Sequence, residues 1–389
     1  MGRDLKIVAG AMFTLALGEG LFFGLVTLHL EGLGATPVII GNVMALYALS
    51  QAVAMIPAGL ATDRWGARQV MLLGWLAALL TLVLMASART LSLFAAGWLV
   101  FGLSCWVIPA LTTYVTNNRG ALAPQRALAL VFAAYSAGMI LSPTVGGLIA
   151  ERYGLRAPFG VAVVFFLASI VMLTFARRDV PQPVSPRGRY TTLMRNRRFL
   201  LLMGLIFVIM MSLWLGLPLA PNYLQAHWGV PVARIGMLGS AESIGGVTLA
   251  LILSRWSPRW ALIGLQVGGM AYLSILLLTG QMPWLALAFF LRVGSYIGRQ
   301  FIDALGTRVV PTSQFGLAFA TTATVQRVAV VLAAMSAGWL YQVRPTLPFQ
   351  VALGLVPVAL ILTWFFAPRV VAEPAGPVLA PAPGQPQEI

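Results

Sequence analysis

Long runs of apolar residues fill most of this chain, and no other feature constrains its fold as strongly. Only 9% of its 389 residues are charged, whereas a soluble protein carries about 25%. A membrane span needs about 20 apolar residues, and a helix satisfies its own backbone hydrogen bonds in lipid. Dividing the chain at turn and charge clusters gives twelve runs, each predicted to be a membrane-spanning helix: 5–30, 38–60, 69–88, 92–115, 125–150, 157–176, 199–222, 232–254, 259–279, 283–305, 314–340 and 347–367. We therefore expect an all-α integral membrane protein.

The net charge of +15 would suit nucleic-acid binding, but the placement of the basic residues argues for lipid instead. With the N-terminus inside, the inner loops contain most of them: Arg3, Lys6, Arg64, Arg68, Arg119, Arg126, the cluster from Arg177 to Arg198, Arg255, Arg259, Arg308 and Arg369. The outer loops contain Arg89, Arg152, Arg156, Arg234 and Arg344. This asymmetry follows the positive-inside rule and predicts a multi-pass protein of the inner (plasma) membrane with both termini in the cytoplasm.

The two halves of the sequence have the same organisation. Six runs precede the hydrophilic stretch 177–198 and six follow it, which predicts bundles at 1–176 and 199–368, a cytoplasmic linker between them and a disordered tail at 369–389. "DRWGAR" at 63–68 is echoed by "SRWSPR" at 254–259, an offset of 191, and Gly147 and Gly338 share that offset. An even number of helices between equivalent positions makes the halves parallel repeats, and such transporters bind substrate where the repeats meet.

Two motifs resemble those of the major facilitator superfamily. "GLATDRWGAR" at 59–68 resembles the family's loop motif between helices 2 and 3, with Ala67 in place of a basic residue; the matching residues are Gly59, Asp63, Arg64, Gly66 and Arg68. "GMILSPTVGG" at 138–147 resembles its helix-5 motif, with Ser142 where a glycine is usual; the matching residues are Gly138, Pro143, Gly146 and Gly147. The resemblance implies twelve helices in two parallel six-helix repeats and a secondary transporter, and the helix-5 motif favours an exporter.

The resemblance also implies a gate. It places Asp63 against the N-terminal end of helix 11, where a carboxylate is stabilised by the helix dipole, with Arg119 as a second candidate partner. The alternative is a polar turn that only anchors topology, which we favour for Arg64 and Arg68. Drug–proton antiporters of the family carry an arginine in helix 4, and here Trp98 occupies that place. The usual helix-4 arginine is therefore missing.

Charged residues inside predicted spans are costly and usually face a cavity where they act. There are six: Glu19, Glu242, Arg292, Arg299, Asp303 and Arg327. A buried carboxyl can change its protonation with its surroundings, so Glu19 is predicted to carry the proton, with Arg292 as its partner charge or as a substrate ligand. Glu242 is a second candidate for proton coupling and Arg327 for substrate binding, but both could instead be fixed structural charges. Arg299 and Asp303, an i, i+4 pair, are predicted to neutralise each other.

Two classes of transporter fit these residues. The first is proton-coupled export of a small amphipathic or drug-like molecule, with Trp98, Tyr135 and Tyr296 among the lining aromatics. The second is proton-coupled transport of a small organic anion bound by Arg292 and Arg327. An intramembrane enzyme is disfavoured, because the chain has no His-Glu-x-x-His sequence and no Walker loop. We expect no cofactor, no bound metal and no nucleic acid; the expected partners are the substrate, protons and membrane lipids around a monomer.

Overall fold

The computed structural model describes residues 2–104, 107–177, 196–292 and 315–371. All regular structure in those ranges is helical. The elements in chain order are α1 Arg3–Phe22, η1 Phe23–Leu25, α2 Val26–Gly32, α3 Pro37–Trp65, α4 Ala67–Ser87, α5 Leu91–Leu103, α6 Val107–Asn117, α7 Pro124–Tyr153, α8 Ala157–Thr174, α10 Arg197–Trp214, α11 Ala220–Trp228, α12 Val232–Leu253, α13 Pro258–Leu278, α14 Met282–Leu291, α16 Phe315–Val343 and α17 Leu347–Val371.

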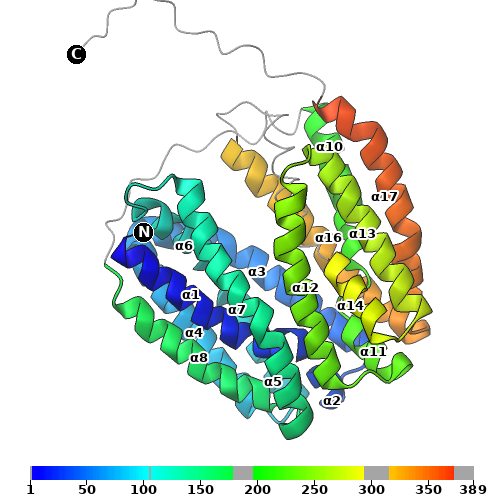
Figure 1. The fold of residues 1–389 in the computed structure, drawn as a ribbon, viewed down its shortest axis with the longest axis horizontal. Coiled ribbons are helices and arrows are strands. Elements are labelled where there is room, and N and C mark those ends of the chain that lie inside the picture. The colour runs from blue at the N-terminus through cyan, green and yellow to red at the C-terminus, as the bar shows by residue number, and fades with distance from the viewer. Residues whose placement is uncertain (1, 105–106, 178–195, 293–314, 372–389) are drawn as a thin grey trace, which may run out of the picture.

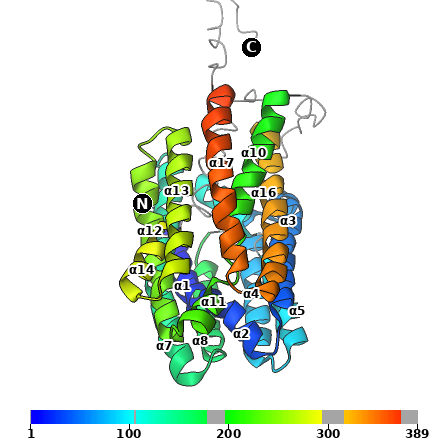
Figure 2. The same ribbon diagram turned by 90° about the vertical axis from the view of Figure 1, so that its right-hand side faces the viewer.

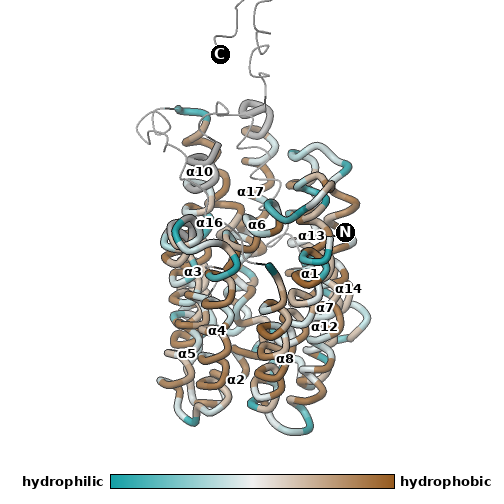
Figure 3. The backbone as a smooth tube through the Cα atoms, turned by 90° about the vertical axis from the view of Figure 1, so that its left-hand side faces the viewer, coloured by the Kyte–Doolittle hydropathy of each residue, from teal (hydrophilic) through white to brown (hydrophobic). Residues whose placement is uncertain are grey.

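The helices account for the predicted spans. Eleven of the described segments are long and apolar enough to cross a membrane, and the shorter apolar helix α14 lies at the position of the tenth predicted run. Figure 3 shows hydrophobic residues along the helices and hydrophilic ones gathered at the turns near both ends. The all-helical, multi-span fold is therefore confirmed, and the helices agree with a total of twelve spans.

Several predicted boundaries need correction. The run 199–222 is broken into α10 and α11 at Leu215–Leu219, because Gly216 and Pro218 favour an interruption there. The run 5–30 contains a 3₁₀ turn, Phe23–Leu25, between two α-helices. Helix α17 continues to Val371, into the stretch predicted to be tail. The predicted linker, apart from its two ends, and most of the tail lie outside the described residues, so these parts of the domain boundaries stay predictions.

The helices form two bundles, α1–α8 and α10–α17, which lie side by side in Figure 1, and Figure 2 looks onto the second bundle with the first behind it. Among the described elements, the bundles are joined chiefly by the pairs α7 with α12, α3 with α16, and α2 with α11, and η1 also contacts α12. In Figure 1 the bundles converge at the end that carries α2 and α11 and diverge toward the end where α1 begins and α17 ends. We call these the α2–α11 end and the open end.

Close backbone approach holds the two long pairs together. A Cβ on Gly147 of α7 would lie 2.9 Å from the Gly236 Cα of α12, and one on Gly338 of α16 would lie 2.6 Å from the Pro37 carbonyl oxygen of α3. Glycine alone fits at such distances, and small residues are the usual means by which membrane helices pack closely. The matched offset of Gly147 and Gly338 therefore has a structural reason, since each glycine joins its own half to the other.

Candidate functional site

A buried carboxyl group lies in the first bundle, between α1 and α7. The Tyr135 hydroxyl donates to Glu19 Oε2 at 2.8 Å, and both side chains are half-buried. No positively charged residue among those described forms an ion pair with Glu19. A charged carboxylate in this position would have only a neutral donor to offset it, which is costly within a membrane span. Glu19 is therefore suited to binding a proton or a cationic group.

A second carboxyl group lies in the other bundle and is paired differently. The Arg292 Nε lies 3.1 Å from Glu242 Oε1, and the two side chains are 11% and 16% exposed. The guanidinium carbon also lies over the rings of Phe289, at 4.9 Å, and Tyr272, at 5.6 Å. The negative faces of these rings attract the cation, so Arg292 is held by both a carboxylate and two aromatic faces.

This arrangement corrects the predicted pairing of Glu19 with Arg292. In the structure Arg292 takes Glu242 as its partner and Glu19 takes Tyr135. The reason is that Glu242 lies on α12 and Arg292 directly follows α14. These two helices pack together within one bundle, whereas α1 belongs to the other. The sequence contained both carboxylates but did not specify which helices are neighbours.

Both carboxyl groups lie beside one short segment of α7. Ser142 Oγ donates to the Ala16 carbonyl oxygen at 3.1 Å, three residues before Glu19 on α1. Thr144 Oγ1 lies 2.7 Å from Ser240 Oγ, two residues before Glu242 on α12. At 1.5 Å of rise per residue, Glu19 and Glu242 are within about 10 Å of each other in depth. The structure thus brings one carboxyl from each bundle to a similar level, with α7 in contact with both supporting helices.

A third charged residue bridges the two bundles. Arg327 of α16 donates through Nη1 to Oε1 of Gln51 on α3. Gln51 was not singled out from the sequence, although an amide side chain inside the apolar run 38–60 could have drawn attention to it. The contact lies well inside both helices, so it joins the bundles at about mid-depth.

Trp98 is placed differently from the expected pocket lining. Its side chain is fully buried and stacks on Tyr47 at 4.3 Å and on Phe101 at 5.6 Å between ring centroids. Phe22 and Phe23 pack around it at 6.4 and 5.7 Å. In this conformation Trp98 has no exposed surface for a substrate. Tyr296, Arg299 and Asp303 lie outside the described residues.

The loop motif 59–68 forms the junction of α3 and α4. Gly66 has φ of +86°, a conformation that glycine adopts readily, and it ends α3 directly before α4. Arg68 Nη2 donates to the Thr174 carbonyl oxygen of α8 at 2.7 Å, while Arg64 is exposed. Arg119 donates to the Thr116 carbonyl oxygen within its own helix at 2.8 Å. Gly59 lies within α3, but its surroundings and the Asp63 side chain lie outside what the structure describes, so the predicted gate stays a prediction.

The helix-5 motif supplies contacts on two sides of α7. Gly138 and Gly146 face α1, where a Cβ on Gly138 would lie 2.6 Å from the Phe13 carbonyl oxygen. Pro143 and Gly147 face α12, where Pro143 Cβ would lie 3.0 Å from a Cβ placed on Gly239. The motif therefore fixes α7 both within its own bundle and against the other one.

Polar contacts close the α2–α11 end. The Asn222 Nδ2 of α11 donates to Glu31 Oε2 and to the Thr27 carbonyl oxygen of α2, the latter at 3.2 Å. Glu151 Oε2 at the end of α7 accepts from the Ala233 N–H of α12 at 2.7 Å. These residues were not singled out from the sequence, because a polar residue near the end of a span usually just faces water.

Within the described residues, no three His, Cys, Asp or Glu side chains form a group that could hold a metal ion. The chemistry available at this site is therefore that of two carboxyl groups, two arginines and a set of aromatic rings. Such a set can exchange protons and bind amphipathic or charged molecules.

Known proteins match this chain over both sequence and fold. The family model described as Major Facilitator Superfamily matches residues 8–219. Multidrug resistance protein 1 of Bacillus subtilis (strain 168) is 23% identical over 265 residues, which cover 66% of this chain and 67% of that protein. The quinolone resistance protein NorA of Staphylococcus aureus (strain Mu50 / ATCC 700699) is 24% identical over 178 residues, 44% of this chain and 46% of that protein. The matched stretch thus spans about two thirds of the first relative and under half of the second.

Solved structures share the fold over nearly the whole chain. A mutant of the nucleoside transporter NupG has a TM-score of 0.77 and 13% identity, covering 95% of this chain and 98% of that one. The peptide transporter POT in complex with sulfate has a TM-score of 0.75 and 15% identity, covering 96% of each chain. At these identities the likeness concerns the fold alone.

Proposed function

Because this chain belongs to the Major Facilitator Superfamily, we propose that it exports small amphipathic, drug-like molecules in exchange for protons. Family membership makes it a multi-span membrane transporter rather than an enzyme. Relatives named for multidrug and quinolone resistance support the drug-like substrate class. The observation that carries the proposal is the carboxyl group of Glu19, held by Tyr135 with no cation among the described residues paired to it.

We place both termini in the cytoplasm of a bacterial plasma membrane, as the excess of basic residues in the inner loops favours. The α2–α11 end then faces outward, where Asn222, Glu31 and Glu151 hold the bundles together. In this orientation the conformation is closed to the outside. Alternating access requires these outer contacts to break while new contacts form at the open end.

Glu19 is the proposed proton acceptor. The negative charge of a carboxylate within a span is either neutralised by a bound proton or offset by a cationic group on a substrate. The proton and the cationic group compete for the same oxygens. Protons entering from outside would displace the substrate, and loss of the proton inside would allow the next substrate to bind. Competition of this kind couples two opposite fluxes without a second substrate site.

Glu242 is the alternative carrier, and Arg292 and Arg327 are the candidate ligands of an anion. The positive charge of Arg292 is offset at 3.1 Å by Glu242, which weakens its pull on an anionic substrate. We therefore favour a cationic or neutral amphipathic substrate. In the loop motif, Asp63 remains our proposed gate residue, with Gly66 and Arg68 holding the loop that presents it.

The test is transport by purified protein in liposomes under an imposed pH gradient, with a quinolone, a cationic dye and an organic anion as separate substrates. We expect the wild type to concentrate the dye or the quinolone, and Glu19→Gln to reduce that uptake to the leak rate. Because glutamine mimics the protonated carboxyl group, which this competition leaves unable to hold a cation, Glu19→Gln should bind the cationic dye more weakly and with an affinity that no longer depends on pH, as equilibrium binding would show.

Asp4→Asn is the matched control, because it changes a carboxylate of the same helix α1 that contacts Arg177 rather than the other bundle, and it should leave pH-driven uptake largely intact. Gradient-driven accumulation by Glu19→Gln would move the coupling to Glu242 or away from carboxylates. Accumulation of the organic anion alone would favour the arginine-based alternative.

A further inference from the structure

A pocket of about 500 Å³ lies between α1 and α8, near the end of the bundle where α1 begins. Arg3, Lys6 and Ile7 of α1 line one side of it, and Met172 of α8 and Phe175 just after α8 line the other. One wall is therefore strongly basic and the other apolar. None of these residues belongs to the candidate transport site.

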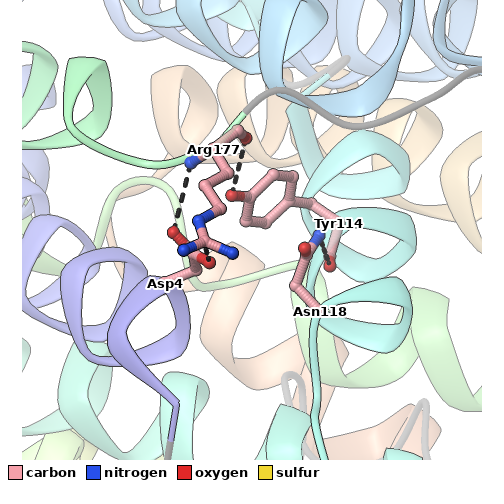
Figure 4. A network of polar contacts seen from close by, with 4 residues as sticks. All are labelled: Asp4, Tyr114, Asn118 and Arg177. Atoms are coloured by element: carbon pink, nitrogen blue, oxygen red, sulfur yellow. Dashed lines mark hydrogen bonds and ion pairs between the residues drawn. The ribbon is translucent and has the colours of Figure 1, made fainter.

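The two basic side chains are available for a ligand. Arg3 and Lys6 are exposed, and no described residue forms a hydrogen bond or ion pair with either side chain. The carboxylate in the same helical turn is engaged elsewhere, since Asp4 accepts the Arg177 backbone N–H at 3.2 Å and lies 3.9 Å from the Arg177 Nε (Figure 4). Two positive charges beside an apolar wall thus remain without a local counter-charge.

The pocket faces away from the transport site. On an α-helix, the 13 positions from Lys6 to Glu19 correspond to a rotation of about 140°, so the two side chains lie on opposite faces of α1. Figure 1 shows α1 between α7 and α8, and the pocket lies at the surface, because Arg3 and Lys6 are exposed and the Phe175 side chain is 64% exposed. The pocket therefore opens toward lipid rather than toward the contact between the bundles.

We propose that this pocket binds one anionic phospholipid of the cytoplasmic leaflet. The lipid phosphate lies between the Arg3 guanidinium and the Lys6 ammonium, and its acyl chains run along Ile7, Met172 and Phe175. A basic pocket at headgroup level with an apolar wall below it matches the charge and the amphipathic shape of such a lipid. This inference rests on the orientation proposed above, but not on the direction, substrate or coupling of transport.

The experiment is a titration of purified protein in detergent, followed by native mass spectrometry, with phosphatidylglycerol, phosphatidylcholine and inorganic phosphate as separate probes. We expect one phosphatidylglycerol to bind more tightly than phosphatidylcholine, and inorganic phosphate not to displace it. Each basic residue near a membrane surface contributes about fivefold to the affinity for anionic lipid, so the double variant Arg3→Gln/Lys6→Gln should bind phosphatidylglycerol about 25-fold more weakly.

Arg126→Gln/Arg255→Gln is the matched control, because it removes two exposed basic residues that do not line the pocket. Phe175→Ala should weaken phosphatidylglycerol binding while all charges are retained. Equal losses in the two double variants would overturn the proposal in favour of general surface charge, and displacement by inorganic phosphate would overturn it in favour of a free-anion site. If Arg3→Gln/Lys6→Gln does not fold, Lys6→Gln alone supplies the comparison, and unchanged binding there also overturns the proposal.

Discussion

At the scale of residues, the two carboxyl groups differ in what offsets their charge. Glu242 has an arginine at 3.1 Å, whereas Glu19 has a tyrosine hydroxyl at 2.8 Å. Removing one residue of a buried ion pair is costly, because the charge of the other residue is left without a partner. This difference is the basis on which we propose Glu19, rather than Glu242, as the proton carrier.

We expect Arg292→Met to destabilise the protein by about 3 kcal/mol, since it leaves Glu242 buried without its cation. Adding Glu242→Gln should recover part of that loss. Unfolding in mixed micelles of both single variants and of the double variant measures the coupling energy between the two sites. Additive losses would show that the two side chains do not stabilise each other. If Glu242→Gln abolished transport without lowering stability, Glu242 would be assigned to proton coupling.

At the scale of elements, α7 connects the two halves of the molecule. Its Ser142 contacts α1, its Thr144 contacts α12, and its Gly147 meets Gly236 at the α2–α11 end. A shift of α7 therefore changes the surroundings of both carboxyl groups together. We therefore expect a change in the contact between the bundles to reach Glu19 and Glu242 through α7.

Gly147→Val tests this role. The new Cβ would lie 2.9 Å from the Gly236 Cα and 3.0 Å from the Ala233 carbonyl oxygen, so α7 and α12 must separate at the α2–α11 end. Overpacking costs about 1–3 kcal/mol, which favours the outward-open state by about fivefold or more. In a Cys105→Ala background, a cysteine at Thr27 should react faster with an impermeant thiol reagent.

Gly160→Val is the control for that experiment, because the glycine lies in α8 with nothing within 4 Å of its Cβ position. It introduces the same side chain into a helix without touching the contact between the bundles. Similar reactivity of the Thr27 cysteine in both variants would show that α7–α12 packing does not influence the conformational equilibrium.

At the scale of the whole molecule, two proposals depend on the proposed orientation. They are that the closed α2–α11 end faces outward and that the lipid pocket lies in the cytoplasmic leaflet. The inner loops contain most of the basic residues, and α1 begins at the same end at which α17 ends. A reporter cysteine inserted in the linker 177–198 and another in the tail 369–389 should be protected from an impermeant reagent in intact cells. A cysteine at Gly229, between α11 and α12, should react. Labelling of either cytoplasmic site would contradict the topology and, with it, the leaflet assigned to the lipid.

Much of the fold follows from the sequence alone, because the cost of burying backbone polar groups in lipid forces each apolar run into a helix. The all-helical, multi-span architecture and the matched offset of Gly147 and Gly338 could be read from apolar length and repeated motifs, but that these glycines join the halves came only from the structure. Helix breaks such as the one at Gly216 and Pro218 were missed, although proline gave a local signal for them.

Which side chains meet was decided only by the tertiary structure. The sequence predicted charged residues at mid-depth but paired Glu19 with Arg292, whereas the structure pairs Glu19 with Tyr135, Glu242 with Arg292, and Arg327 with Gln51. Apolar length fixes how deep a residue lies, but the rotation of each helix and the choice of its neighbours depend on close packing between bundles. The residues available to the site are therefore determined by the sequence, and their partners by the way the helices pack.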